Sequence, residues 1–231
     1  MEKQDVLNLL GANKNERGMW HWERLGSKTG GLKSFGIGLT QLRALAKQIG
    51  RDRDLARTLW ETDVYEAKVI SLLIDDPKAI TRQQAETQVE ELGSGQLSHV
   101  FASCDATLAK TSFVVELADD WVMSSDPVRR TCGYGLLYEI SKFTGKKAPD
   151  EEFFLKHVEH IGETIADETS SVRLAMGGAL MGIGKRSARL NEVALVVAEA
   201  VGPIEFESAS GKCEPFDVAK HLRAARPKLG T

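Results

Sequence analysis

Two segments of the chain repeat one pattern, and this repetition constrains the fold more than any other feature of the sequence. Residues 125–140 and 170–183 each begin with serine, continue with a Val-Arg pair and place a glycine four residues after the arginine. Val128 corresponds to Val172, so the two copies are 44 residues apart. This offset is typical of the two-helix units of HEAT and armadillo repeats.

Each copy has the pattern of a turn followed by a buried helix. In the first copy Ser125 or Asp126 can cap the helix, and Pro127 suits its first turn because the missing N–H would have no partner there. Every fourth residue after the cap is apolar, which makes a stripe along one face of the helix. The stripe consists of Val128, Cys132, Leu136 and Ile140.

The rest of the chain is also predicted to be helical, because apolar residues recur at helical spacing and no long stretch alternates with a period of two. The expected helices are 1–11, 40–49, 54–60, 64–74, 81–92, 97–109, 112–123, 125–140, 151–166, 170–185, 191–201 and 216–225. We therefore expect an all-α fold, an α-solenoid of antiparallel helix pairs. One domain would span 1–231, with an N-terminal helix and Gly/aromatic loop at 1–38, repeats at 39–201 and a C-terminal loop and helix at 202–231.

The sequence Met19-Trp20-His21-Trp22 lies in the glycine-rich stretch 17–38. Two interpretations stay open for these aromatic residues. They could pack as a plug over the first repeat, or they could form a wedge that stacks on nucleic-acid bases.

Composition excludes several classes of protein. No apolar run approaches the roughly 20 residues that a membrane helix needs, and the N-terminus has no secretory pattern. Three widely spaced cysteines without zinc-ligand spacing indicate a reducing, cytoplasmic location and no metal site. The net charge of −3 argues against indiscriminate binding to nucleic acid but allows a basic face.

Several short segments, in their order and spacing over about residues 35–190, resemble the DNA alkylation repair enzymes of the AlkD-like type. A tail segment, from Gly211-Lys212-Cys213 to Ala219, is similar to one branch of that family. The segments are Phe35 to Gly38, Leu42 to Lys47, Leu59-Trp60, Tyr65 to Ala67, Asp75 to Pro77, Ser103 to Asp105, Trp121, Val128 to Arg130 and Ile183 to Arg186.

The resemblance implies a solenoid of HEAT-like helix pairs with a concave, basic groove for duplex DNA. The well-studied enzymes cut the N-glycosidic bond of N3- or N7-alkylated purines without a metal or other cofactor and without flipping the base. Their working residues are a tryptophan, an aspartate four residues later and an arginine on the next inner helix. We expect the present chain to act as a monomer.

Carried over by position, the aspartate is Asp105 and the arginine is Arg130, with Arg129 as its neighbour in case of a one-residue slip. The tryptophan position holds Phe101, and a second groove tryptophan of the family falls near Gly178. A fixed carboxylate can stabilise the positive charge that develops on the deoxyribose, and an arginine can hold the phosphate beside it. Phenylalanine offers a cationic base weaker cation–π attraction than tryptophan.

Other interpretations of these residues stay open. Asp105 could be an ion-pair partner of Arg130 that joins adjacent helices, and Phe101 could belong to the core. On the expected helix, Phe101 and Asp105 would share a face because they are four residues apart.

A set of basic residues is expected to contact DNA phosphates along one edge of the solenoid. Most of them lie near the C-terminal ends of successive inner helices, where they could instead complement helix dipoles. The set is Arg129 and its repeat counterpart Arg173, then Lys142, Lys146, Lys147, Lys185, Arg186 and Arg189.

Three functional hypotheses follow from the sequence. The first is a glycosylase that excises alkylated purines from duplex DNA. The second is a non-catalytic module of the same fold that binds DNA or another phosphate-rich partner. The third is a protein-interaction scaffold, a common use of helical repeats.

Overall fold

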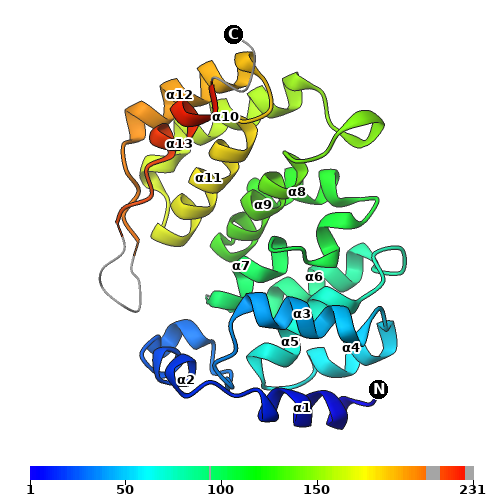
Figure 1. Ribbon diagram of the computed structural model, residues 1–231. Helices are drawn as coiled ribbons and strands as arrows, with labels where there is room; N and C mark the ends of the chain where they lie inside the picture. The colour runs from blue at the N-terminus through cyan, green and yellow to red at the C-terminus, as the bar shows by residue number, and fades with distance from the viewer. Residues whose placement is uncertain (94, 207–213, 227–231) are drawn as a thin grey trace. The chain divides into compact units, whose positions relative to one another are not determined.

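The computed structural model describes residues 1–93, 95–206 and 214–226, and over these residues it contains α-helices, short 3-10 helices and no strand (Figure 1). The only β-type pairings in this part of the chain are two isolated bridges, Lys33 with Val64 and Ile204 with Phe216. The all-α class is confirmed. The chain divides into unit 1, Met1–Phe113, and unit 2, Val114–Thr231, which we describe separately.

Unit 1 is built around α5 (Tyr65–Ile74), the helix of this unit with the largest number of buried residues. Helices α3 (Leu39–Ile49) and α4 (Arg53–Trp60) pack on it, as do α1 (Lys3–Ala12) and α7 (Gln96–Ala102). The unit also contains α2 (Glu16–Glu23), α6 (Arg82–Glu90) and the 3-10 helices Gly26–Thr29 and Thr107–Lys110. For the stretch 17–38 the sequence allows either a loop-rich segment or an ordered insert, and the structure shows an ordered insert that contains most of a capped α-helix and a 3-10 helix.

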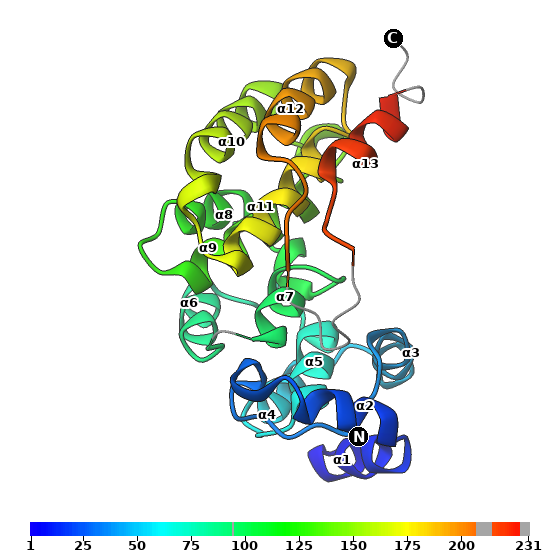
Figure 2. The ribbon, with the colours of Figure 1, turned by 90° about the vertical axis from the view of Figure 1, so that its left-hand side faces the viewer.

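Unit 2 is built around α9 (Pro127–Ile140) and α11 (Ser170–Ile183), the two copies of the repeated segment, which pack on each other. Helix α8 (Val114–Val122) covers α9, and α10 (Glu151–Thr164), α12 (Ala188–Val201) and α13 (Val218–Ala225) complete the unit. Figure 2 shows α10 and α13 on either side of α12. The predicted helix cap is confirmed, since the Asp126 side chain accepts a hydrogen bond from Val128 N–H with Pro127 in the first turn.

The glycine shared by the two copies allows close packing at both positions. A Cβ atom on Gly133 would lie 2.7 Å from the backbone nitrogen of Val122, so only glycine lets α9 approach the end of α8 so closely. A Cβ atom on Gly177 would lie 2.6 Å from Ile204 Cδ1 and 3.1 Å from the Phe216 ring. The pattern therefore reflects helix packing rather than a ligand site.

His157 on α10 is buried beside Asp119 of α8, whose Oδ1 lies 3.3 Å from its Nε2. Burial lowers the pKa of His157 to about 4, and the negative charge of Asp119 only partly opposes this. The unfolded chain therefore binds more protons than the folded protein between about pH 6.5 and pH 4.

We predict that the free energy of unfolding falls by about 2 kcal/mol between pH 7 and pH 4.5 because of His157. Urea denaturation at the two pH values should show a smaller fall for His157→Gln than for the wild type. His160→Gln, which replaces a partly exposed histidine on the same helix, should keep the wild-type fall. Equal falls in all three proteins would contradict the prediction.

Candidate nucleic-acid interface

Asp105 lies in a left-handed turn and not on a helix. Helix α7 ends at Ala102, and the next α-helix does not begin until Val114. Cys104 and Asp105 have φ values of 59° and 71°, the only positive values for non-glycine residues in the described part of the chain. The helix expected over 97–109 is therefore wrong after Ala102, and with it the expectation that Phe101 and Asp105 share a helix face.

The turn presents the Asp105 carboxylate to solvent beside two cations of unit 1. Arg43 Nε on α3 lies 2.9 Å from Asp105 Oδ2, with side-chain exposures of 41% and 65%. Lys110 Nζ donates a hydrogen bond of 3.2 Å to the Asp105 carbonyl oxygen. The observed ion-pair partner of Asp105 is thus Arg43. The spacing of residues in the sequence could not have predicted this pair.

Phe101 is fully buried and belongs to the core of unit 1. Its ring centroid lies 6.1 Å from that of Trp60 on α4, and Trp60 is anchored by a 2.6 Å hydrogen bond from its Nε1 to Glu91 Oε2. No face of the Phe101 ring is open to solvent. This burial favours the interpretation of Phe101 as a core residue over that of a base contact.

Cys104, next to Asp105, carries a partly exposed thiol in a polar setting. Its Sγ lies 3.4 Å from His99 Nε2 and 3.5 Å from the Ser103 hydroxyl. Burial alone would raise the pKa of the Cys104 thiol, but hydrogen bonds to His99 and Ser103 and the positive charges of His99 and Arg43 lower it overall. The Asp105 turn therefore holds a thiol biased toward thiolate.

Arg130 of unit 2 has a structural role at the start of α9. It pairs with Glu168 at 2.6 Å and donates to the carbonyl oxygens of Ser124 and Ser125 at 2.8 and 2.9 Å. Its side chain is 19% exposed. The guanidinium thus ties the turn before α9 to the segment before α11, and Glu168 is its ion-pair partner within unit 2.

Most of the other basic residues expected to contact DNA have acidic or backbone partners of their own. Arg129 lies 3.9 Å from Asp126, Arg189 pairs with Glu152 at 2.9 Å, and Lys142 pairs with Glu139 at 2.9 Å.

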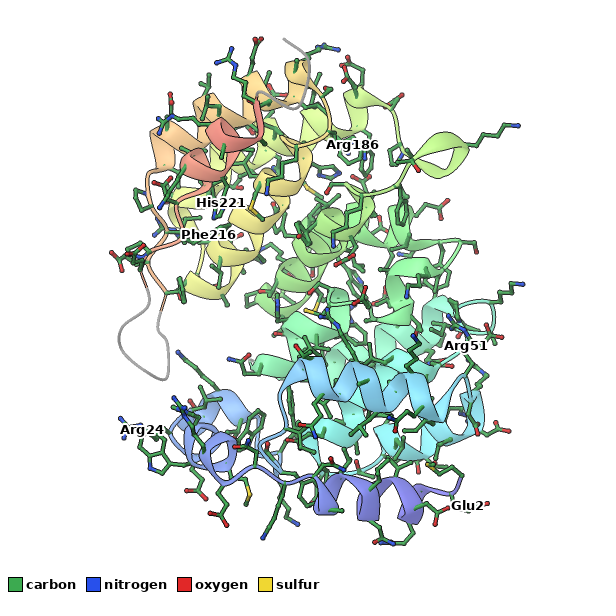
Figure 3. All side chains as sticks on the ribbon, in the orientation of Figure 1. Glu2, Arg24, Arg51, Arg186, Phe216 and His221 are labelled. Atoms are coloured by element: carbon green, nitrogen blue, oxygen red, sulfur yellow. The ribbon has the colours of Figure 1, made fainter. Side chains whose placement is uncertain are left out.

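Arg186 donates to the Ser141 and Phe143 carbonyl oxygens, and its guanidinium carbon lies 4.3 Å from the Phe154 ring centroid. Figure 3 labels Arg186. Burial lowers the pKa of Arg186, and the negative charge of Glu151 partly opposes this shift. Arg186 therefore stabilises unit 2, and the phosphate contact expected of it is not supported.

Three of the expected DNA contacts remain available to a ligand. Lys146 and Lys185 are exposed, and their side chains make no hydrogen bond or ion pair within the described residues. Arg173 on α11 is partly exposed, and its Nε is buried without a hydrogen-bond partner. The side chain of Lys147 lies outside the described residues, as does Cys213.

The surface near the repeat glycines of α11 is only partly flat. A Cβ atom on Gly178 would meet nothing within 4 Å, but Ile204 and Phe216 cover Gly177. Phe216, labelled in Figure 3, is the residue paired with Ile204 by the isolated bridge. Of these two glycines, Gly178 alone leaves the surface of α11 open.

Across the described residues, no group of three or more His, Cys, Asp or Glu side chains is placed to hold a metal ion. Nor does that part of the chain contain a helix with the length and apolar character needed to span a membrane.

Comparisons with known proteins agree with this architecture. A family model described as DNA alkylation repair enzyme matches residues 6–203. A solved structure, described as belonging to a new family of proteins related to the HEAT-like repeat DNA glycosylases with affinity for branched DNA structures, is similar with a TM-score of 0.82 and 23% identity. The match covers 100% of this chain and 97% of that one, which confirms the HEAT-like fold. No curated protein sequence matches the chain.

We predict that iodoacetamide labels Cys104 faster than Cys132 at pH 7, because Cys132 is fully buried and burial raises the pKa of its thiol. Replacing His99 by Gln should slow labelling of Cys104 about fivefold by removing the charge and hydrogen bond that favour the thiolate. Peptide mass spectrometry would measure each cysteine separately. Equal Cys104 rates in the wild type and His99→Gln would contradict the prediction.

Proposed function

The chain belongs to the DNA alkylation repair enzyme family, and from that premise we propose that it is a DNA-binding repair protein that holds its substrate through backbone phosphates. The observation that carries the proposal is the exposed corner formed by Arg43, Asp105 and Lys110. The affinity for branched DNA attributed to the similar solved structure supports DNA as the partner.

The geometry of Arg43 suits phosphate binding. Asp105 engages only the Nε of Arg43, and the terminal NH groups make no hydrogen bond or ion pair within the described residues. A guanidinium presents several donors in one plane, so Arg43 can pair with Asp105 and a phosphate at once. In this proposal Arg43, and not Arg130, keeps the bound strand beside Asp105.

The charge of the chain does not oppose this function. The net charge of −3 is a sum over the whole chain, whereas phosphate contacts depend on the local field. Exposed cations are present in both units, with Arg43 and Lys110 in unit 1 and Lys146 and Lys185 in unit 2. Each phosphate contact releases counterions from the DNA, so affinity should depend steeply on salt.

Hydrolysis of the N-glycosidic bond of alkylated purines is the second candidate function, and the exposure of the Asp105 carboxylate favours it. An ionised carboxylate beside the deoxyribose would stabilise the positive charge that develops as the bond breaks, and it could orient the attacking water. In this chain the chemistry would depend on Asp105 with Arg43 as its positioning residue, because Phe101 is buried and Arg130 is bound to Glu168.

We predict that the wild-type protein binds duplex DNA and that its affinity falls steeply as salt is raised. Arg43→Ala should weaken binding and reduce the slope of log affinity against log salt by about one. Fluorescence anisotropy with a labelled duplex would measure both quantities. Arg57→Ala, which removes another exposed arginine of unit 1, is the matched control and should retain the wild-type slope. Absence of duplex binding at low salt would refute the proposed function.

For the second candidate we predict release of 3- or 7-methylpurines from methylated DNA, with a loss of about 100-fold or more in Asp105→Asn. Phe101→Trp should give no gain, because a larger ring in that packed position costs about 1–3 kcal/mol of stability. Chromatography of the released bases would measure the rates. If the wild type releases no more base than Asp105→Asn, the glycosylase hypothesis is wrong. The proposed DNA binding does not depend on that result.

A further inference from the structure

The two tryptophans of α2 have opposite environments. Trp22 faces unit 1, where its ring lies 4.5 Å from that of Tyr65 and its Nε1 donates a 2.9 Å hydrogen bond to the Leu32 carbonyl oxygen. Trp20 is 52% exposed, and it is the only exposed tryptophan of the four in the chain. Trp22 is thus the packing plug, whereas the ring of Trp20 is accessible to a ligand.

Trp20 lies in a stripe of basic and aromatic side chains along the exposed face of α2. Arg17, Trp20, His21 and Arg24 are spaced i, i+3, i+4 and i+7, which places them on one face of a helix. The guanidinium carbon of Arg24 lies 4.7 Å from the Trp20 ring centroid, and the His21 ring lies 4.9 Å from that ring. Figure 3 labels Arg24 at the edge of unit 1, beyond α2.

The helix that presents this stripe is firmly held. Gly18 and Gly36 approach so closely that a Cβ atom on Gly18 would lie 1.9 Å from the Gly36 carbonyl oxygen. The backbone N–H of Asn15 donates to Phe35 O at 2.8 Å.

The segment that contacts α2 is bound in turn to Glu66, which is fully buried at the start of α5. Its carboxylate accepts hydrogen bonds from the Ser34 hydroxyl at 2.6 Å, Phe35 N–H at 3.0 Å and Ile37 N–H at 3.1 Å. An exposed tryptophan on a fixed support loses little conformational freedom when it binds a ligand.

We propose that the exposed face of α2 is a binding site for unpaired nucleobases of DNA, with Trp20 as the stacking surface and Arg17 and Arg24 as partners of the adjoining phosphates. This inference rests on the proposed DNA-binding function and specifies a kind of DNA that the Asp105 corner does not select. Every base has a π-face that can stack on an aromatic ring, and cationic side chains beside the ring bind the backbone.

The charges on α2 favour nucleic acid over an apolar protein segment as the occupant. The stripe itself contains two arginines, whereas Glu16 and Glu23 lie on the flank of the helix, outside the i, i+3, i+4, i+7 set. An apolar partner would have to desolvate both guanidinium groups without compensation. A base in a duplex is already stacked and paired, so only an unpaired base can lie on Trp20 without a further energetic cost.

The test compares two labelled DNAs of equal length, one fully paired and one with a short run of unpaired thymidines, by fluorescence anisotropy. We expect Trp20→Ala to weaken binding of the DNA with unpaired bases about tenfold and to change duplex affinity less than twofold. Trp20→Phe should retain most of the affinity for unpaired bases, because it keeps an aromatic face. Arg24→Ala should reduce the salt dependence for that DNA.

Met123→Ala is the matched control, since it truncates another exposed apolar side chain and should leave both affinities unchanged. Equal affinity of Trp20→Ala and the wild type for unpaired bases would overturn the inference, as would equal losses for the two DNAs, and in either case the proposed function would stand. If the wild type binds neither DNA, the proposed function itself fails. Thermal denaturation of Trp20→Phe and Trp20→Ala would verify that both variants fold.

Discussion

The hydrogen bonds of one buried carboxylate hold the N-terminal part of the protein in place. Glu66 is inaccessible to water at the first turn of α5, the helix on which unit 1 is built, and its two oxygens satisfy three donors from residues 34–37. A buried backbone N–H without an acceptor costs about 1–3 kcal/mol. The position of α2, and hence of Trp20, depends on this carboxylate because residues 35 and 36 contact the start of α2.

Burial separates the residues that we propose to contact DNA from the residues that stabilise the fold. Asp105, Arg43 and Trp20 expose their polar groups or ring to solvent, whereas Phe101, Arg130 and Arg186 are largely enclosed and satisfied within their own units. Similarity to a repair family therefore predicts the architecture of this chain better than it predicts the residues that act on a substrate. Arg130 is the residue at the position of the family arginine, and its guanidinium is hydrogen-bonded to Glu168.

The sequence was sufficient for the all-α class and for most helices, because apolar spacing in helices such as α9 and α11 records which face is buried. The sequence-based prediction failed where the backbone conformation of one or two residues determines whether a helix continues. Residues 97–109 have helical composition, but the left-handed turn at Cys104 and Asp105 interrupts it, and aspartate is among the few residues that tolerate this conformation. In the stretch 17–38, abundant glycine obscured α2, although Asn15 before Glu16 is a recognisable helix cap.

The candidate site was less predictable than the fold because it depends on contacts between residues far apart in the chain. Nothing in the spacing of the sequence connects Arg43 with Asp105, or Arg130 with Glu168. The family resemblance pointed to Asp105 as a candidate, but it did not point to Arg43, the ion-pair partner of Asp105. The two tryptophans of α2, separated by one residue, differ in exposure because successive helix positions turn by about 100°.

The enclosure of Phe101 has a consequence for studies of natural or random variation. A substitution there disturbs the packing with Trp60 and lowers the amount of folded protein, so an organism carrying it would resemble one that lacks the gene. Genetic screens scored by survival would therefore rank this phenylalanine with true ligand contacts. Screens that also record protein abundance would separate the two groups, since substitution of an exposed residue such as Trp20 is expected to leave the chain folded.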